Sequence, residues 1–120
     1  MAINKFSFPK SRRLTCRPEF ERVKRSGEVH PGKSLLLNVL RVEPGACFRA
    51  GFVTSRKIGA AVVRNRVRRR LREIVRKHQH EIVEPVWIVT VARAAAARAT
   101  FAQLEDAWLR LARRASILAL

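Results

Sequence analysis

The chain has 120 residues, of which 48% are hydrophobic, a share that suits one folded domain and is too high for an intrinsically disordered chain. Its 26 Lys and Arg residues against 9 Asp and Glu residues give a formal net charge of +17, which favours RNA, DNA or an anionic membrane as the partner. No apolar run approaches the ~18 residues of a membrane span, and the start of the chain lacks the apolar stretch of a signal peptide. We therefore expect a cytoplasmic protein with a single domain over 1–120, in which Cys16 and Cys47 are free thiols.

The N-terminal part of the chain combines a basic segment with one short helix. Residues 1–13 are basic and are expected to form a flexible arm. Pro18 suits the first turn of a helix, where its missing N–H costs nothing, and Gly27 suits the cap after a helix end near Ser26. Pro31-Gly32 then indicates a turn.

Two apolar runs follow and predict strands. Ser34–Val42 and Cys47–Thr54 are rich in Leu, Val and Phe, and the segment 43–46 between them contains Pro and Gly. Because only a short turn separates the two runs, we expect them to pair as an antiparallel hairpin.

The next segment combines the densest charge of the chain with helical periodicity. Residues 56–77 hold ten Lys or Arg residues and one acid, Glu73. From Gly59 or Ala60 to about His80, apolar residues recur at i, i+4, i+8 and i+11, which places one face of a helix on the core: Val63, Val67, Leu71 and Ile74. The opposite half of this helix carries arginines: Arg68, Arg69, Arg72 and Arg76.

The C-terminal third predicts one more strand and one more helix. Val86–Val91 is a strong strand signal that follows a helix, so it is a candidate for the second strand of a β-α-β crossover. Thr100 and Gln103 form a capping box pattern for a final helix, whose apolar face is Phe101, Leu104, Trp108 and Leu111. Phe52, Trp87 and Trp108 are interpreted mainly as core residues.

Enzyme motifs are missing from the sequence. There is no phosphate-binding Walker loop, no nucleophile elbow and no cluster with metal-ligand spacing. His78 and His80 are two residues apart, which puts them on different sides of a helix, and a solvated or phosphate-near role is favoured over a metal site. We therefore expect no catalytic residue and no metal site in the protein, and the protein alone is not expected to cleave RNA.

The segments Ser55–Gly59 and Ala61–Glu73 resemble the signature of the bacterial ribonuclease P protein component, a family characterised by the tripeptide found here as Arg64-Asn65-Arg66. Segments elsewhere in the chain are similar to the family's first helix, the strand before the signature, its last strand and the entry to its last helix: Phe20–Val23 with Gly27, Ala50–Val53, Ile88–Arg93 and Thr100–Phe101. The resemblance covers roughly residues 10–115. It implies an α/β (α+β) two-layer sandwich, with a single mixed sheet of about four strands packed with helices, and a β-α-β crossover of left hand, an exception to the usual right-handed rule.

The resemblance also implies a function. In this family the RNA subunit hydrolyses a phosphodiester bond to remove the 5′ leader of precursor tRNA, and the protein assists by binding RNA. The implied partners are the ribonuclease P catalytic RNA, in a 1:1 complex, and precursor tRNA, with no membrane involved. The protein alone binds no cofactor, and the magnesium that the holoenzyme requires is held through the RNA.

Two surfaces are implied by the same resemblance. One binds the RNA subunit through the signature helix and the loop before it: Arg56, Lys57, Arg64, Asn65, Arg66, Arg68, Arg69 and Arg72. The other is a cleft between the first helix and the sheet that receives the single-stranded leader: Phe20, Lys24, Asn38, Arg12 and Arg13. Aromatic rings stack on unpaired bases, so Phe20 is the candidate platform, although its spacing also permits a core position. Lys24 and Asn38 stand where the family often has aromatic residues, and we hypothesise that leader binding here is unusually sensitive to salt.

Other classes of basic protein remain as alternatives. A ribosomal RNA-binding protein or assembly factor would share the size and charge, but it would not distinguish precursor from mature tRNA. A DNA-binding basic region is disfavoured because neither a zipper nor a helix-turn-helix pattern is visible. A membrane-surface helix ranks last, since the apolar face of the basic helix is needed to cover the sheet.

Overall fold

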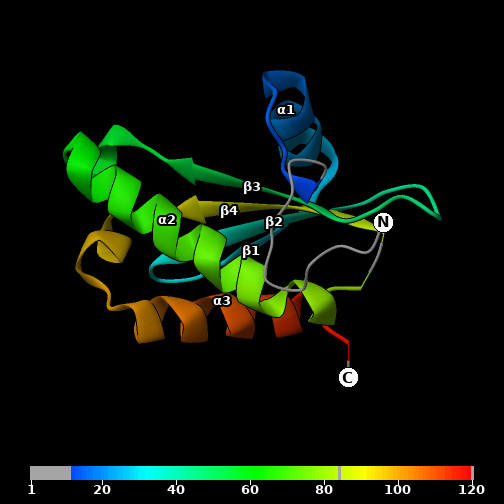
Figure 1. The fold of residues 1–120 in the computed structure, drawn as a ribbon. Coiled ribbons are helices and arrows are strands. Elements are labelled where there is room, and N and C mark those ends of the chain that lie inside the picture. The colour runs from blue at the N-terminus through cyan, green and yellow to red at the C-terminus, as the bar shows by residue number, and fades with distance from the viewer. Residues whose placement is uncertain (1–11, 84, 120) are drawn as a thin grey trace, which may run out of the picture.

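The computed structural model describes residues 12–83 and 85–119, so most of the expected N-terminal arm lies outside the described residues. Helices and strands occur in the order α1 (Arg17–Ser26), β1 (Glu28–Pro31), β2 (Leu35–Arg41), β3 (Arg49–Thr54), α2 (Ala61–His78), β4 (Val86–Ala92) and α3 (Phe101–Arg114). Three short 3-10 helices connect them: η2 (Arg56–Ile58), η3 (Gln79–Glu81) and η4 (Ala94–Arg98). The strands form one mixed sheet, with α2 and α3 layered on one face and α1 standing on the other (Figure 1).

The prediction that the segments 34–42 and 47–54 pair as a hairpin is wrong: they form β2 and β3, which do not pair with each other. The order across the sheet is β1-β2-β4-β3, so β4 lies between β2 and β3 and pairs with both. It is antiparallel to β2 and parallel to β3, with Ile88 opposite Val39 and Ala50. A strand as continuously apolar as Val86–Val91 is stable at the centre of a sheet, covered on both faces, and this burial outweighs the short loop between β2 and β3. The β3-α2-β4 unit is the expected β-α-β crossover, and its left hand stays an expectation.

Strand β1 was not predicted from the sequence, which indicated only a turn at Pro31-Gly32. Glu28–Pro31 has only four residues, is largely exposed, and pairs along one side only, with β2. Proline is tolerated on such an edge strand, where one side of the backbone has no partner strand. A short, polar edge strand of this kind lacks the apolar alternation that marks strands in a sequence.

The main core lies between the sheet and the helices α2 and α3. Val67, Leu71 and Ile74 of α2 are fully buried there, as the helical spacing predicts. Helix α3 contributes Trp108, which is fully buried and donates its indole N–H to the Thr90 hydroxyl at 3.2 Å. The predicted capping box opens α3, because the Thr100 hydroxyl accepts from the Gln103 N–H at 3.1 Å.

A smaller cluster joins α1 to the opposite face of the sheet. Val23 of α1 and Val89 of β4 are buried in it, and Phe20 and Trp87 pack against them. Gly51 on β3 permits this packing, because a Cβ atom there would lie 2.5 Å from the Phe20 ring. Phe20 therefore packs over β3 at a position where the strand carries no side chain.

Candidate nucleic-acid interface

Helix α2 turns its charged half away from the core. Its four fully buried residues form one stripe, and Arg68 and Arg72 lie half-buried at the edge of that stripe on the side of β3. Arg68 is held there by a hydrogen bond from its guanidinium to the Thr54 hydroxyl at 2.6 Å. The strand end thus fixes the direction of a charged side chain that would otherwise be free to rotate.

One hollow of about 200 Å³ lies between α1, β3 and α2, and we call it the Phe20 hollow. Two aromatic residues, Phe20 and Phe52, contribute to its wall, together with three guanidinium-bearing residues: Arg13, Arg68 and Arg72. Two of the residues expected to bind the leader, Phe20 and Arg13, are thus brought together with two residues expected to bind the RNA subunit.

A second and more open hollow of about 490 Å³ lies on the outer side of α2, and we call it the Asn65 hollow. Its lining residues are Val62, Asn65, Arg68, Arg69 and Arg72, so it shares two arginines with the Phe20 hollow. Val62 is 77% exposed, so it adds an accessible apolar side chain to a surface of arginines. The sequence missed this residue because an apolar residue in an amphipathic helix is normally assigned to the core.

The charges around Arg72 are crowded. Partial burial lowers the pKa of the Arg72 guanidinium, and the neighbouring guanidinium groups of Arg13 and Arg68 lower it further. The Nε atom of Arg72 is buried and has no hydrogen-bond partner among the described residues. Arginine remains charged under such conditions, so the two hollows form a site of crowded positive charge that a bound phosphate would stabilise.

The remaining signature residues surround this site at different depths. Arg56 and Lys57 are exposed on η2, immediately before α2, and Arg69 is exposed on α2 itself. Arg64 donates to the Gly59 carbonyl at 3.3 Å, and Arg66 donates to the Ala97 carbonyl at 3.0 Å. Arg66 therefore also links α2 to η4, a role that spacing in the sequence does not reveal.

Three residues expected in the leader cleft lie away from the Phe20 hollow. Arg12 donates to the Gln79 amide at 3.1 Å and lies 4.8 Å from the centroid of the Phe48 ring, near the end of α2. Lys24 is exposed on α1. Asn38 is buried in β2, 6% exposed, with its amide directed at Gly27 after α1.

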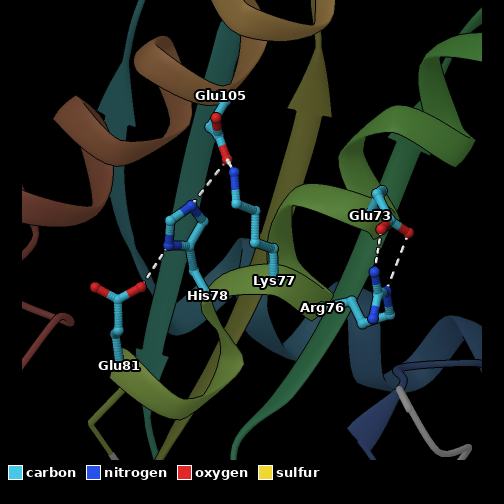
Figure 2. Close-up of polar contacts among 6 residues, drawn as sticks. All are labelled: Glu73, Arg76, Lys77, His78, Glu81 and Glu105. Carbon is cyan, nitrogen blue, oxygen red and sulfur yellow. Dashed lines mark hydrogen bonds and ion pairs between the residues drawn. The ribbon is translucent and has the colours of Figure 1, made fainter. Parts of the chain in front are cut away.

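His78 is part of a polar cluster at the end of α2 (Figure 2). One ring nitrogen contacts the Glu81 carboxylate, the other lies 3.0 Å from the Glu105 carboxylate, and the ring stacks on Trp108. Lys77 reaches the same carboxylate of Glu105 at 3.0 Å. This cluster connects α2 to α3, and within residues 12–83 and 85–119 no group of His, Cys, Asp and Glu side chains could hold a metal ion.

A mixed sheet backed by two helices, with an arginine-lined helix face beside an aromatic hollow, defines a protein of the nucleic-acid-binding class. In the described part of the chain, no helix has the length and apolar character needed to span a membrane. Both cysteines are free, as the sequence predicts.

Known proteins place the chain more narrowly within this class. The family model described as Ribonuclease P matches residues 8–116. The ribonuclease P protein component of Symbiobacterium thermophilum is 38% identical over 109 residues, which cover 91% of this chain and 95% of that protein. That of Brevibacillus brevis is 35% identical over 109 residues, covering 91% and 86% of the two chains.

Solved structures agree with this placement. The RNase P protein of Staphylococcus aureus superposes with a TM-score of 0.84 at 25% identity, covering 91% of this chain and 99% of that one. The RNase P protein of Thermotoga maritima gives a TM-score of 0.76 at 26% identity, covering 85% and 96% of the two chains. The chain belongs to the ribonuclease P protein component family.

Proposed function

We propose that the protein is the protein subunit of ribonuclease P and assists removal of the 5′ leader from precursor tRNA. The observation that supports this most directly is the pair of adjoining hollows that share Arg68 and Arg72. The Asn65 hollow, with η2, offers phosphate-binding groups to a folded catalytic RNA. The Phe20 hollow offers a ring and guanidinium groups to a single-stranded leader.

In this proposal the RNA subunit carries out the hydrolysis, and the protein contributes binding energy. Guanidinium groups bind phosphates in a bidentate manner and stay charged, so they hold RNA without reading its sequence. The magnesium ions that activate water are held by the RNA and the substrate. One protein binds one catalytic RNA, and the complex works in the cytoplasm.

The decisive experiment is cleavage of precursor tRNA by a bacterial ribonuclease P RNA at low magnesium, with and without the protein. We expect a large protein-dependent gain that shrinks when the leader is shortened to one or two nucleotides. An Arg68→Ala/Arg72→Ala variant should lose most of the gain. Its matched control is Arg110→Ala/Arg113→Ala, which removes the same charge from exposed positions on α3 and should keep it.

Two results would contradict the proposal. One is the absence of any gain with the wild-type protein together with tight binding to ribosomal RNA, which would favour a ribosomal protein or assembly factor. The other is a gain that both double variants keep equally, because the shared arginines would then have no special role.

A further inference from the structure

A third hollow, of about 740 Å³, is larger than the two hollows described above and shares no residue with them. It opens between η2, η4 and the loop that joins β1 to β2, and we call it the alanine hollow. Its wall is composed of four alanines and Ile58 with polar residues around them, and three of those carry positive charge: Lys33, Lys57 and Arg98.

Hydrogen bonds hold the walls of this hollow in place from two sides. Arg66 and Arg70 of α2 donate to the carbonyls of Ala97 and Ala99, both at 3.0 Å, so η4 is fixed against the basic helix. On the other side, Arg93 donates through its side chain to the Gly32 carbonyl at 2.7 Å and through its backbone to the Ser34 carbonyl at 2.9 Å. The loop that carries Lys33 is thereby attached to the end of β4.

The wall of the hollow combines positive charge with an apolar lining. Lys33, Lys57 and Arg98 are exposed cations, and no acid is found among the described residues that line the hollow. The alanine methyl groups and Ile58 leave an apolar floor that a larger residue would fill. At the start of α3 the Gln103 N–H is already bonded to the Thr100 hydroxyl, and the three side-chain cations carry the full charges that would attract a phosphate.

We propose that the alanine hollow binds an unpaired nucleotide of RNA, with its phosphates on Lys33, Lys57 and Arg98 and its base against the alanine floor. The proposal rests on the RNA partner that the family implies, and it does not depend on leader removal. Lys57 on η2 makes the hollow continuous with the surface expected to bind the catalytic RNA, so a single RNA strand could reach both. Double-stranded RNA is excluded, because its bases are paired and cannot enter.

The test measures binding of a twelve-nucleotide oligouridylate by fluorescence anisotropy as a function of salt, in a Phe20→Ala background that weakens the other single-strand site. Loss of two single-strand phosphate contacts in Lys33→Ala/Arg98→Ala should lower the slope of log K against log salt by about 1.4. The control Arg110→Ala/Arg113→Ala removes the same charge from α3 and should leave the slope within a few tenths of the parent.

A second pair of variants tests the base without changing charge. Ala94→Leu puts bulk into the hollow from an exposed position and should weaken oligouridylate binding at least about fivefold, because the base can no longer enter. Ala102→Leu places the same side chain on an exposed position of α3 outside the hollow and should bind like the parent. If Ala94→Leu or Lys33→Ala/Arg98→Ala binds as its control does, the proposal is wrong.

The outcome separates this proposal from the proposed function. A protein that stimulates cleavage while the hollow variants match their controls overturns the alanine hollow alone. A protein whose hollow variants lose oligouridylate binding, but which gives no gain in cleavage, supports the hollow and contradicts the role in ribonuclease P. Matching thermal unfolding curves for all variants confirm that the changes act on binding.

Discussion

Phe20 has features of both alternatives that the sequence left open, a core residue and a stacking platform. The ring packs over Gly51 and against the small cluster around Val23, so it is anchored. It is nevertheless only half-buried and lines the Phe20 hollow beside Arg68 and Arg72. An anchored ring with an accessible part stacks on a base at little entropic cost, which suits the leader platform.

The first prediction compares this ring with Lys24, four residues further along α1. Phe20→Ala should weaken binding of leader-bearing precursor tRNA by roughly fivefold to a hundredfold, because stacking is worth about 1–3 kcal/mol per base. Lys24→Ala should weaken the same binding more modestly and lower its salt slope by about 0.7, as expected for one single-strand phosphate contact. Affinity measured for precursor tRNA with the catalytic RNA present, at several salt concentrations, provides both numbers.

Mature tRNA is the control, since it has no leader and should bind both variants like wild type. The hypothesis of a salt-sensitive leader site is wrong if Lys24→Ala binds the precursor like wild type while Phe20→Ala does not. In that case the exposed position of Lys24 on α1 would be a solvated surface only.

Asn38 shows why single positions are harder to predict than elements. The family resemblance assigns it to the leader cleft, and its strand was predicted correctly. Its contacts depend on how α1 lies over β2: the amide oxygen is buried beneath Gly27 and has no hydrogen-bond partner among the described residues. No local pattern in the sequence encodes the position of a helix over a strand, so this burial could not be foreseen.

At the scale of elements, the connection between α2 and α3 determines where the basic face points. Glu105 of α3 accepts from Lys77 and His78 at the end of α2, and both contacts measure 3.0 Å (Figure 2). The Glu105 side chain is 20% exposed, so these contacts are only partly screened by solvent. Hydrogen bonds from Lys77, followed by those from His78, lower the pKa of the Glu105 carboxyl below its usual 4.5.

The second prediction concerns acid stability. A carboxyl whose pKa is lower in the folded state stabilises the fold above its unfolded pKa, and this stabilisation is lost as the pH falls through the folded value. Glu105→Gln should therefore lower the free energy of unfolding at pH 7 by about 1–2 kcal/mol and by progressively less below about pH 4.5. Urea unfolding of both proteins from pH 7 to pH 3 measures this difference.

Glu21→Gln is the matched control, because Glu21 forms an exposed pair with Arg17 in which both side chains are more than half exposed. Such a pair contributes little to stability. A Glu105→Gln effect that does not shrink with acid would show that the loss comes from packing and not from the charge.

Elements with local signals were predictable and their pairing was not. The period of Val63, Val67, Leu71 and Ile74 defined α2, and the Thr100 box defined the start of α3. The position of β4 between β2 and β3 depends on contacts between residues that are far apart in the sequence. No local pattern encodes such contacts. The same holds for η4, whose place against α2 rests on the side chains of Arg66, which was expected to bind the RNA subunit, and of Arg70, to which no role was assigned.

For the molecule as a whole, the net charge of +17 on 120 residues opposes compaction. The arginines are not spread evenly: Arg13, from the segment before α1, lies beside Arg68 and Arg72 of α2 around one hollow, and the charges of Arg13 and Arg68 disfavour that of Arg72. Folding brings these groups together, so part of the folding free energy opposes their repulsion. An anion seated in the hollow would remove that cost and would bind the folded state only.

The last prediction follows by linkage. A ligand that binds only the folded state adds RT ln(1 + [L]/Kd) to its stability, about 2.7 kcal/mol at a hundred times Kd. The protein should therefore be marginal in very low salt, and sulfate should raise its Tm more than chloride does at equal ionic strength, by about 4 °C or more for each kcal/mol. Calorimetric melts in the two salts measure this difference, and screening alone predicts equal shifts.

Arg68→Ala/Arg72→Ala should lose the extra shift in sulfate and melt higher than wild type in very low salt, because two crowded charges are gone. Arg110→Ala/Arg113→Ala removes equal charge from exposed positions and should keep the extra shift. A cooperative melt of the wild type that stays unchanged between very low salt and added sulfate would show that the core alone holds the fold. The charge would then serve RNA binding without any cost to stability.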